Sequence, residues 1–295
     1  MNRAMNPSPV IFGEVLYDCF EDGSRILGGA PFNVAWHLQA FGVSPLLISR
    51  VGDDAMGRGI RETMLRWGMS TAGLQLDSAH ATGEVQVSLQ AGQPSFDIVI
   101  DRAFDHIEAG ALPPLQPSLI YHGTLALRQP ESAAALNELL RHYPVRVFLD
   151  VNLRSPWWNV NQTLQLLERA RWVKVNDAEL EILIDGPATL TDKAKTMMER
   201  YDLDWLIVTQ GKKGASSVDR TGSVLQVAAT ADIMVVDTVG AGDAFASVAI
   251  LGLLREWPNE LIIERAQRFA ALLVGTRGAT LTESAPYQAL LAEWL

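Results

Sequence analysis

The chain has 295 residues, of which 48% are hydrophobic and 20% are charged, so it is long enough to bury a large core. Its formal charge of −10 argues against a nucleic-acid or anionic-membrane partner, because both demand clustered Lys and Arg. Cys19 is the only cysteine, which excludes an intrachain disulfide and a cysteine-based zinc site. Residues 1–9 are polar and no run approaches about 18 uninterrupted apolar residues, so a cytoplasmic protein is expected.

Short apolar runs typical of strands alternate with helical patterns along most of the chain. Strands are expected at residues 10–16, 46–51, 119–121, 145–150, 172–175 and 205–209. Helices are expected between them, at residues 33–41, 56–67, 131–142, 161–170 and 193–201. This alternation predicts an α/β fold, with a mainly parallel sheet covered on both faces and ligands gathered at the carboxyl ends of the strands.

Two predicted hairpins interrupt the alternation. The first joins residues 83–90 to 95–100 through a turn at 91–94, and no helix follows it. We expect it to belong to a small β appendage that acts as a lid or a dimer contact. The second joins residues 214–218 to 223–227 and is expected at a sheet edge near the site. The last third is helical, at 241–254 and 260–275.

Residues 235–245 join an apolar run to a turn of small residues and then to an apolar helix. Gly240, Ala241 and Gly242 carry little side-chain bulk, so their N–H groups can approach a polyphosphate at the positive end of the following helix. Asp243, in the first helical turn, can accept the proton of an alcohol that attacks the terminal phosphate. The alternative is an ordinary turn in which Asp243 only favours the helix N-terminus, but the rest of the chain favours phosphoryl transfer.

A second informative segment begins at Gly28 and Gly29. Paired glycines let the backbone come close to a ligand, and Asn33 offers a donor and an acceptor to hydroxyl groups. A tight turn in which Asn33 bonds only to local backbone is an equal alternative. Upstream, Asp18 is a candidate for bidentate binding of sugar hydroxyls, and an exposed surface acid is its alternative.

Four ordered segments resemble the signatures of the ribokinase-like (PfkB-type) carbohydrate kinases. Residues 28–52 and 237–243 resemble the N-terminal and C-terminal signatures, and Asn176-x-x-Glu179 and Thr209-x-Gly211-x-x-Gly214 resemble two further elements. Fructokinases are the most similar group, through residues 13–14, 121–127 and 150–154 followed by a Trp pair at 157–158. The resemblance implies a three-layer α/β/α domain over residues 1–295, with lid strands near 16–28 and 83–101 and a homodimer through the lid.

The same resemblance implies roles for individual residues. Asp243 is the expected base, and the amides of residues 240–242 form the expected anion hole. Asn176 and Glu179 are expected to hold Mg²⁺ through water, since they share a face if a helix begins at Asn176; a helix cap is the alternative. The expected sugar contacts are Asp18, Gly28, Gly29, Asn33, Arg154 and Asp243. The expected nucleotide contacts are Lys174, Asn176, Thr209, Gly211, Gly214, Gly240 and Gly242.

Arg154 is the cation suited to a phosphate or a sugar carboxylate, with a surface ion pair as its alternative. Two residues depart from the family pattern: Val248 replaces a small residue, and Phe104 replaces a Tyr common in fructokinases, which weakens the case for fructose. The sequence predicts ATP-dependent phosphorylation of a primary sugar hydroxyl, with fructose as the first candidate acceptor. A monovalent cation such as K⁺ is a candidate cofactor, and the sequence leaves the need for it open.

Alternative acceptors are 2-keto-3-deoxygluconate, ribose and a nucleoside. A catalytically silent sugar-binding regulatory protein is the alternative from a different class. A nicotinamide-dinucleotide oxidoreductase is disfavoured, because the first strand is not followed by Gly-x-Gly-x-x-Gly.

Overall fold

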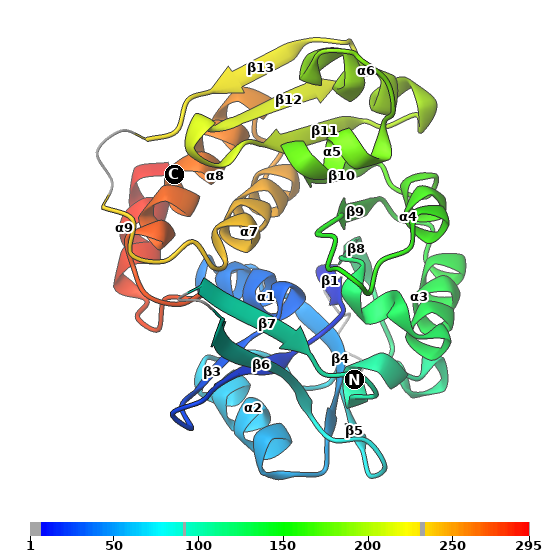
Figure 1. Ribbon diagram of the computed structural model, residues 1–295, viewed down its shortest axis with the longest axis vertical. Coiled ribbons are helices and arrows are strands. Elements are labelled where there is room, and N and C mark those ends of the chain that lie inside the picture. Colours follow the sequence, from blue (N-terminus) through cyan, green and yellow to red (C-terminus); the bar gives the residue numbers. More distant parts are fainter. Residues whose placement is uncertain (1–6, 91–92, 231–233, 295) are drawn as a thin grey trace, which may run out of the picture. The chain divides into compact units, whose positions relative to one another are not determined.

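The computed structural model describes residues 7–90, 93–230 and 234–294. The chain forms two compact units, which are described separately (Figure 1). The first consists of residues 1–117, 126–144 and 282–295, and the second consists of residues 118–125 and 145–281. Among the described residues, no helix is both long and apolar enough to cross a lipid bilayer.

The first unit contains three parallel strands in the order β1 (Ser8–Phe12), β4 (Leu46–Gly52) and β5 (Leu74–Asp77). Its helices are α1 (Ala30–Ala40), α2 (Ala55–Arg66), α3 (Pro130–His142) and α9 (Ala285–Trp294), with short 3-10 turns η1 (Ala103–His106) and η2 (Ala109–Ala111). The apolar run of β1 is almost fully buried, as expected for a parallel strand covered on both faces. Tyr287 on α9 ties that helix to α1, with its hydroxyl 2.8 Å from His37 Nδ1.

The strand expected at 10–16 ends earlier, at Phe12. Gly13 has a φ of 149°, and a Cβ at this position would lie 2.5 Å from Pro31 Cγ, so the chain turns away at a point where only glycine fits. A new strand, β2, then begins at Leu16. Strand β5 and helix α9 were not predicted from the sequence.

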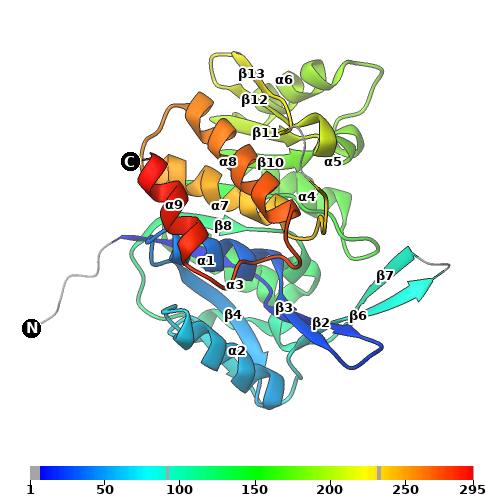
Figure 2. The same cartoon turned by 90° about the vertical axis from the view of Figure 1, so that its left-hand side faces the viewer.

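The second sheet of the first unit has the order β3 (Arg25–Gly28), β2 (Leu16–Phe20), β6 (Gly83–Gln90) and β7 (Gln93–Ile98). Leu16 lies opposite Gly83 in the parallel β2–β6 pair, whereas β6 and β7 form an antiparallel hairpin. The turn expected at 91–94 lies partly outside the described residues. Strands β2, β6 and β7 extend away from β4 and α2 (Figure 2).

The second unit holds four parallel strands and an antiparallel hairpin at the sheet edge. Their order is β13 (Val224–Val227), β12 (Ala215–Asp219), β11 (Trp205–Thr209), β10 (Trp172–Asn176), β9 (Val147–Asp150) and β8 (Pro117–His122). The helices are α4 (Val160–Leu167), α5 (Asp177–Leu183), α6 (Leu190–Arg200), α7 (Ala241–Leu254) and α8 (Asn259–Val274). The 3-10 turns are η3 (Leu125–Arg128), whose first residue alone lies in this unit, and η4 (Gly211–Lys213).

Helices cover both faces of this part of the sheet. Helices α7 and α8 lie on one face of β10–β13, and α5 and α6 lie on the other (Figure 2). The α/β class and the small second sheet are therefore as the sequence predicted. Helix α7 has the predicted bounds, but helix α4 ends at Leu167 rather than at residue 170.

Candidate active site

The turn before α7 requires glycine at residue 240. Gly240 is the N-cap of α7 in the left-handed conformation, with a φ of 79°, and a Cβ there would lie 2.5 Å from Ala279 Cα. The Ala244 N–H donates to the Gly240 carbonyl at 2.8 Å and starts the helix. The first N–H groups of a helix lack partners within it, so the amides of residues 242 and 243 point at the space before α7. The Ala241 N–H donates to the Thr238 carbonyl at 3.4 Å.

Asp237 holds this turn in place through both carboxylate oxygens. Its Oδ1 accepts from the Val239 N–H at 3.0 Å, and its Oδ2 accepts from the Gly278 N–H at 3.1 Å. Val274, the last residue of α8, accepts from the Val236 N–H at 2.9 Å. Residues 234–236 form no strand, although they are apolar. The turn is therefore fastened to the end of α8 and to the segment that follows it.

A buried cation lies directly beside the turn. Lys174 on β10 pairs in register with Asp150 on β9, and its Nζ donates to Asp150 Oδ1 at 2.8 Å and to Oδ2 at 3.0 Å. Nζ is 3.4 Å from the position of a Cβ on Gly242. Burial lowers the pKa of Lys174, but Asp150, Glu179 and Asp243 raise it by more, so the net pKa is raised and the amine stays charged.

Asn176 and Glu179 form a capping box at the start of α5. Asn176 Oδ1 accepts from the Glu179 N–H at 2.8 Å, and Glu179 Oε2 accepts from the Asn176 N–H at 2.9 Å. Asn176 is thus the N-cap, and α5 begins at the next residue. The expectation that Asn176 and Glu179 share a helix face required the helix to begin at Asn176 itself. Glu179 Oε1 also accepts from the Leu153 N–H at 2.8 Å. Burial raises the pKa of Glu179, although these backbone bonds and Lys174 oppose the shift.

This arrangement fits Mg²⁺ better through water than by direct ligation. Each Glu179 carboxylate oxygen already accepts a backbone N–H, which leaves one lone pair on each for a water molecule. Mg²⁺ keeps several waters in most protein sites, so it suits the ion if Glu179 binds one of these waters rather than the ion itself.

A cavity opens between the loop that joins β11 to β12 and the helices α7 and α8. Its volume of about 550 Å³ is in the range of small-molecule sites. It contains the expected Thr209, Gly211, Gly214, Ala241 and Gly242. Gly214 has a φ of 96°, and a Cβ there would lie 2.0 Å from the Val227 carbonyl oxygen, so the loop admits only glycine. Thr209 ends β11, and its hydroxyl lies 3.4 Å from the Val175 carbonyl.

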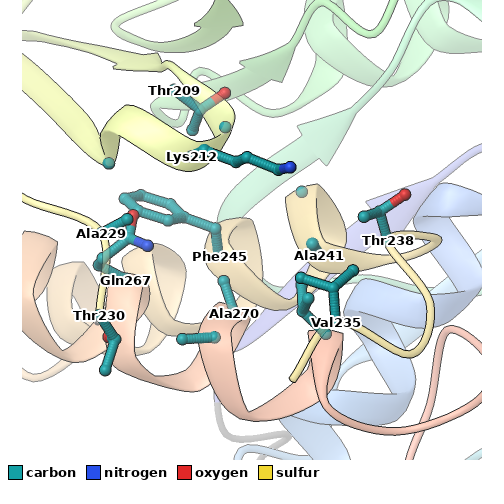
Figure 3. Close-up of a pocket in the computed structure, with 15 residues that line it drawn as sticks. Thr209, Lys212, Ala229, Thr230, Val235, Thr238, Ala241, Phe245, Gln267 and Ala270 are labelled. Atoms are coloured by element: carbon teal, nitrogen blue, oxygen red, sulfur yellow. The ribbon is translucent and has the colours of Figure 1, made fainter. Parts of the chain in front are cut away.

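Figure 3 shows that the cavity has two different ends. Phe245 and Ala270, from α7 and α8, form an apolar wall, with Gln267 beside it. Lys212 extends across the opposite side with its amine toward Ala241 and Thr238. The sequence did not identify Lys212, Phe245, Gln267 or Ala270, because they meet only through the packing of α8 on α7 and the η4 turn.

The amino acids near the N-terminus that are expected to bind the sugar form a cluster within the first unit. Asp18 on β2 is half-buried, and its Oδ2 lies 3.7 Å from the position of a Cβ on Gly28. Gly29 has a φ of 106°, and a Cβ there would lie 2.7 Å from the Glu14 carbonyl oxygen. The Asn33 N–H donates to the Gly29 carbonyl at 2.8 Å, and the Asn33 side chain is buried. Glycine at residue 29 therefore brings Asn33 onto the first turn of α1.

Three further residues were singled out from the sequence, one in the first unit and two in the second. Arg154 belongs to the second unit, where its side chain is exposed and its carbonyl accepts from the Trp157 N–H at 2.7 Å. Val248 is fully buried in α7. Phe104, in the first unit, is also fully buried, and the Arg128 guanidinium lies 5.0 Å from its ring centroid.

Comparison with known proteins shows which family the chain resembles. The model of the pfkB family carbohydrate kinases matches residues 14–286. A fructokinase of Klebsiella pneumoniae is 31% identical over 93% of this chain and 95% of its own length. The crystal structure of a fructokinase with bound ATP from Xylella fastidiosa has a TM-score of 0.86 at 20% identity, covering 97% of this chain and 98% of the other.

A third similar protein is the aminoimidazole riboside kinase of Salmonella enterica, solved in complex with aminoimidazole riboside and an ATP analog. It has a TM-score of 0.82 at 25% identity, covering 96% of this chain and 99% of the other. The three-layer α/β/α fold and the phosphotransferase class are confirmed.

Proposed function

The chain belongs to the pfkB family of carbohydrate kinases, and we propose that it transfers the γ-phosphate of ATP to a primary hydroxyl of fructose, with Asp243 as the base. The observation that carries this proposal is the junction of the Gly240 turn with the buried Lys174 ammonium. A cation 3.4 Å from the Cβ position of Gly242 adds positive charge to a turn that already directs amides at its ligand.

The proposed nucleotide position follows from the two ends of the cavity. The apolar wall of Phe245 and Ala270 suits the adenine ring, and the Lys212 amine and the amides of residues 241–242 suit the phosphates. Thr209, Gly211 and Gly214 form the loop side of the same cavity. The terminal phosphate would then lie before α7, in reach of the first-turn residue Asp243.

The reaction requires two contributions from the protein. The amides of residues 240–242 stabilise the charge on the equatorial oxygens of the transferred group, and the Asp243 carboxylate accepts the hydroxyl proton as the new O–P bond forms. Mg²⁺, held through water by Asn176 and Glu179, would supply further charge neutralisation at the phosphates. A requirement for a monovalent cation such as K⁺ stays a prediction.

The acceptor is proposed from two sources. The fructokinase of Klebsiella pneumoniae supports fructose, and the cluster of Asp18, Gly28, Gly29 and Asn33 offers the hydroxyl-binding groups that a sugar needs. A nucleoside is the second candidate, favoured by the similarity to the aminoimidazole riboside kinase. 2-Keto-3-deoxygluconate and ribose stay as further alternatives, and the exposed Arg154 guanidinium is the group suited to a sugar carboxylate.

The test measures ADP formed by the purified chain with ATP and Mg²⁺ and, in separate reactions, fructose, ribose, 2-keto-3-deoxygluconate and a ribonucleoside. We expect turnover with fructose to exceed that with each of the others. Turnover confined to another acceptor would refute fructose and keep the mechanism. Absence of turnover with measurable ATP binding would favour a silent sugar-binding protein. The single-domain organisation, the homodimer through the second sheet and the cytoplasmic location also stay predictions.

A further inference from the structure

Three potential metal ligands meet at the base of the second sheet, within the first unit. His80, Asp101 and His106 each direct one ligand atom into a group whose members all lie within 4.8 Å of one another. His106 Nε2 is 2.9 Å from Asp101 Oδ1, and His80 Nε2 is 3.7 Å from the same oxygen. The imidazole rings stack with centroids 3.7 Å apart. None of these residues belongs to the proposed kinase machinery.

Each histidine is oriented by a second carboxylate on its other ring nitrogen. His80 Nδ1 lies 2.9 Å from Asp77 Oδ2, and His106 Nδ1 lies 2.5 Å from Glu131 Oε2. A carboxylate on Nδ1 fixes the tautomer that leaves the Nε2 lone pair for a metal, and metal-bound histidines commonly have such a partner. The carboxylates on the two Nδ1 atoms therefore orient both Nε2 atoms toward Asp101, independently of any contact with Asp101 itself.

The orienting carboxylates are themselves fixed. Asp77 is 2% exposed, and its Oδ1 accepts from the N–H groups of Ala79 and His80 at 2.7 and 3.0 Å. Although burial opposes ionisation, these bonds and the nearby Arg50 leave the pKa of Asp77 lowered. Glu131 lies in the first turn of α3, where the helix favours a negative charge.

We propose that His80, Asp101 and His106 form a binding site for a divalent transition metal. Zn²⁺ is the first candidate, with water as the fourth ligand. Two imidazoles and one carboxylate make a ligand set that Zn²⁺ accepts, whereas Mg²⁺ prefers oxygen ligands alone. Coordination in the plane of both rings requires them to tilt out of the stack. His80, whose side chain is 28% exposed, is the ring with space to do so.

The position of the ligands indicates what the ion would do. His80 lies in the segment that leads from β5 into β6, and Asp101 and His106 follow β7. One ion would therefore link both ends of the β6–β7 hairpin across its base, in addition to the backbone bond from the Ala103 N–H to the Ala81 carbonyl. We expect it to stabilise the second sheet against local opening.

The experiment titrates ZnCl₂ into the chelator-stripped full chain without nucleotide, using a chromophoric zinc chelator as competitor. We expect one tight site per chain, a higher unfolding temperature with zinc, and d–d absorption bands when Co²⁺ replaces Zn²⁺. Asp101→Asn and His80→Ala should each weaken zinc at least about tenfold, and Glu131→Gln about tenfold to a hundredfold.

His142→Ala is the matched control, since His142 also contacts a carboxylate, Glu138 at 3.2 Å, but is part of no ligand cluster among the described residues. It should keep the affinity of the natural chain. Asp101 is exposed, so Asn at that position should leave the zinc-free unfolding temperature unchanged. Equal zinc affinity in the natural chain and in Asp101→Asn, or an equal loss in His142→Ala, would overturn the proposal, whatever the outcome of the sugar assays.

Discussion

The ammonium of Lys174 ends 3.4 Å from the point at which a Cβ on Gly242 would lie. The strand β10 thus brings a buried cation to the first turn of α7, and Asp150 holds that cation from the neighbouring strand at 2.8 Å. A Cβ at residue 242 would therefore lie against the ammonium, whereas a Cβ at residue 240 would meet Ala279 at 2.5 Å. Glycine at residue 240 is required by the left-handed turn itself.

Removing either charge of the Lys174–Asp150 pair should lower the stability of the chain. Asp150→Asn leaves a buried ammonium without its counter-ion, and Lys174→Met leaves a buried carboxylate, so each should destabilise the chain by roughly 3–5 kcal/mol. The double variant should lose less stability than the sum of the two single losses, since it leaves no buried charge without a partner. Urea unfolding of all four proteins measures the coupling. Additive losses would show that the two charges do not depend on each other.

Gly240→Ala should destabilise the chain more than Gly222→Ala does. Both glycines have a φ of 79°, so both substitutions carry the penalty of a left-handed residue, roughly 1–2 kcal/mol. Only Gly240 also meets Ala279, at 2.5 Å, whereas nothing lies within 4 Å of the Cβ position on Gly222. Urea unfolding measures the difference, and equal losses at the two positions would contradict a packed turn before α7.

Ala270→Phe should fill the apolar end of the cavity and exclude the nucleotide base. The KM for ATP should rise at least about tenfold, which corresponds to about 1.4 kcal/mol of binding, while the KM for the sugar changes little. Ala134→Phe, on the exposed side of α3, is the control and should leave both constants unchanged. An unchanged KM for ATP in Ala270→Phe would place the nucleotide elsewhere.

His122 should make the chain lose stability in acid. It is buried, its Nδ1 lies 2.9 Å from the Gly123 carbonyl oxygen, and burial lowers its pKa from 6.5 to about 4. Between these values the unfolded chain binds a proton that the folded chain excludes, so stability falls as the pH drops through 6.5. The loss from His122 between pH 7 and pH 5 should be about 2 kcal/mol.

His122→Met should remove that part of the pH dependence, although it also removes the bond to Gly123. The measurement is urea unfolding at several pH values for the natural chain, His122→Met and the exposed-residue control His142→Met. The control should keep the slope of the natural chain. A slope unchanged by His122→Met would show that this histidine is protonated in the folded state at those pH values.

Local patterns were sufficient where the structure is local. Strand β11 and helix α7 have the predicted bounds because a continuous apolar run or a helix with a glycine N-cap carries its own signals. Lys174 was placed at the nucleotide by family resemblance, but its pairing with Asp150 depends on the register of β9 against β10, which no local pattern encodes.

The wall of the cavity and the metal cluster were missed for the same reason. Phe245 and Ala270 lie on different helices and meet only after α8 packs on α7. His80 and His106 are separated by a whole hairpin in the sequence, and two isolated histidines at that spacing match no ligand motif. Gly13 was a signal that could have been used, because glycine within an apolar run often marks the end of a strand.

The measurement that tests the central claim most directly is ADP formation by Asp243→Asn with ATP, Mg²⁺ and fructose. Asparagine keeps the shape of the side chain but removes its basicity, so turnover should fall roughly a hundredfold or more while ATP still binds. Asp185→Asn, at an exposed position, is the control and should retain full turnover. Near-normal turnover by Asp243→Asn would contradict the assignment of Asp243 as the base.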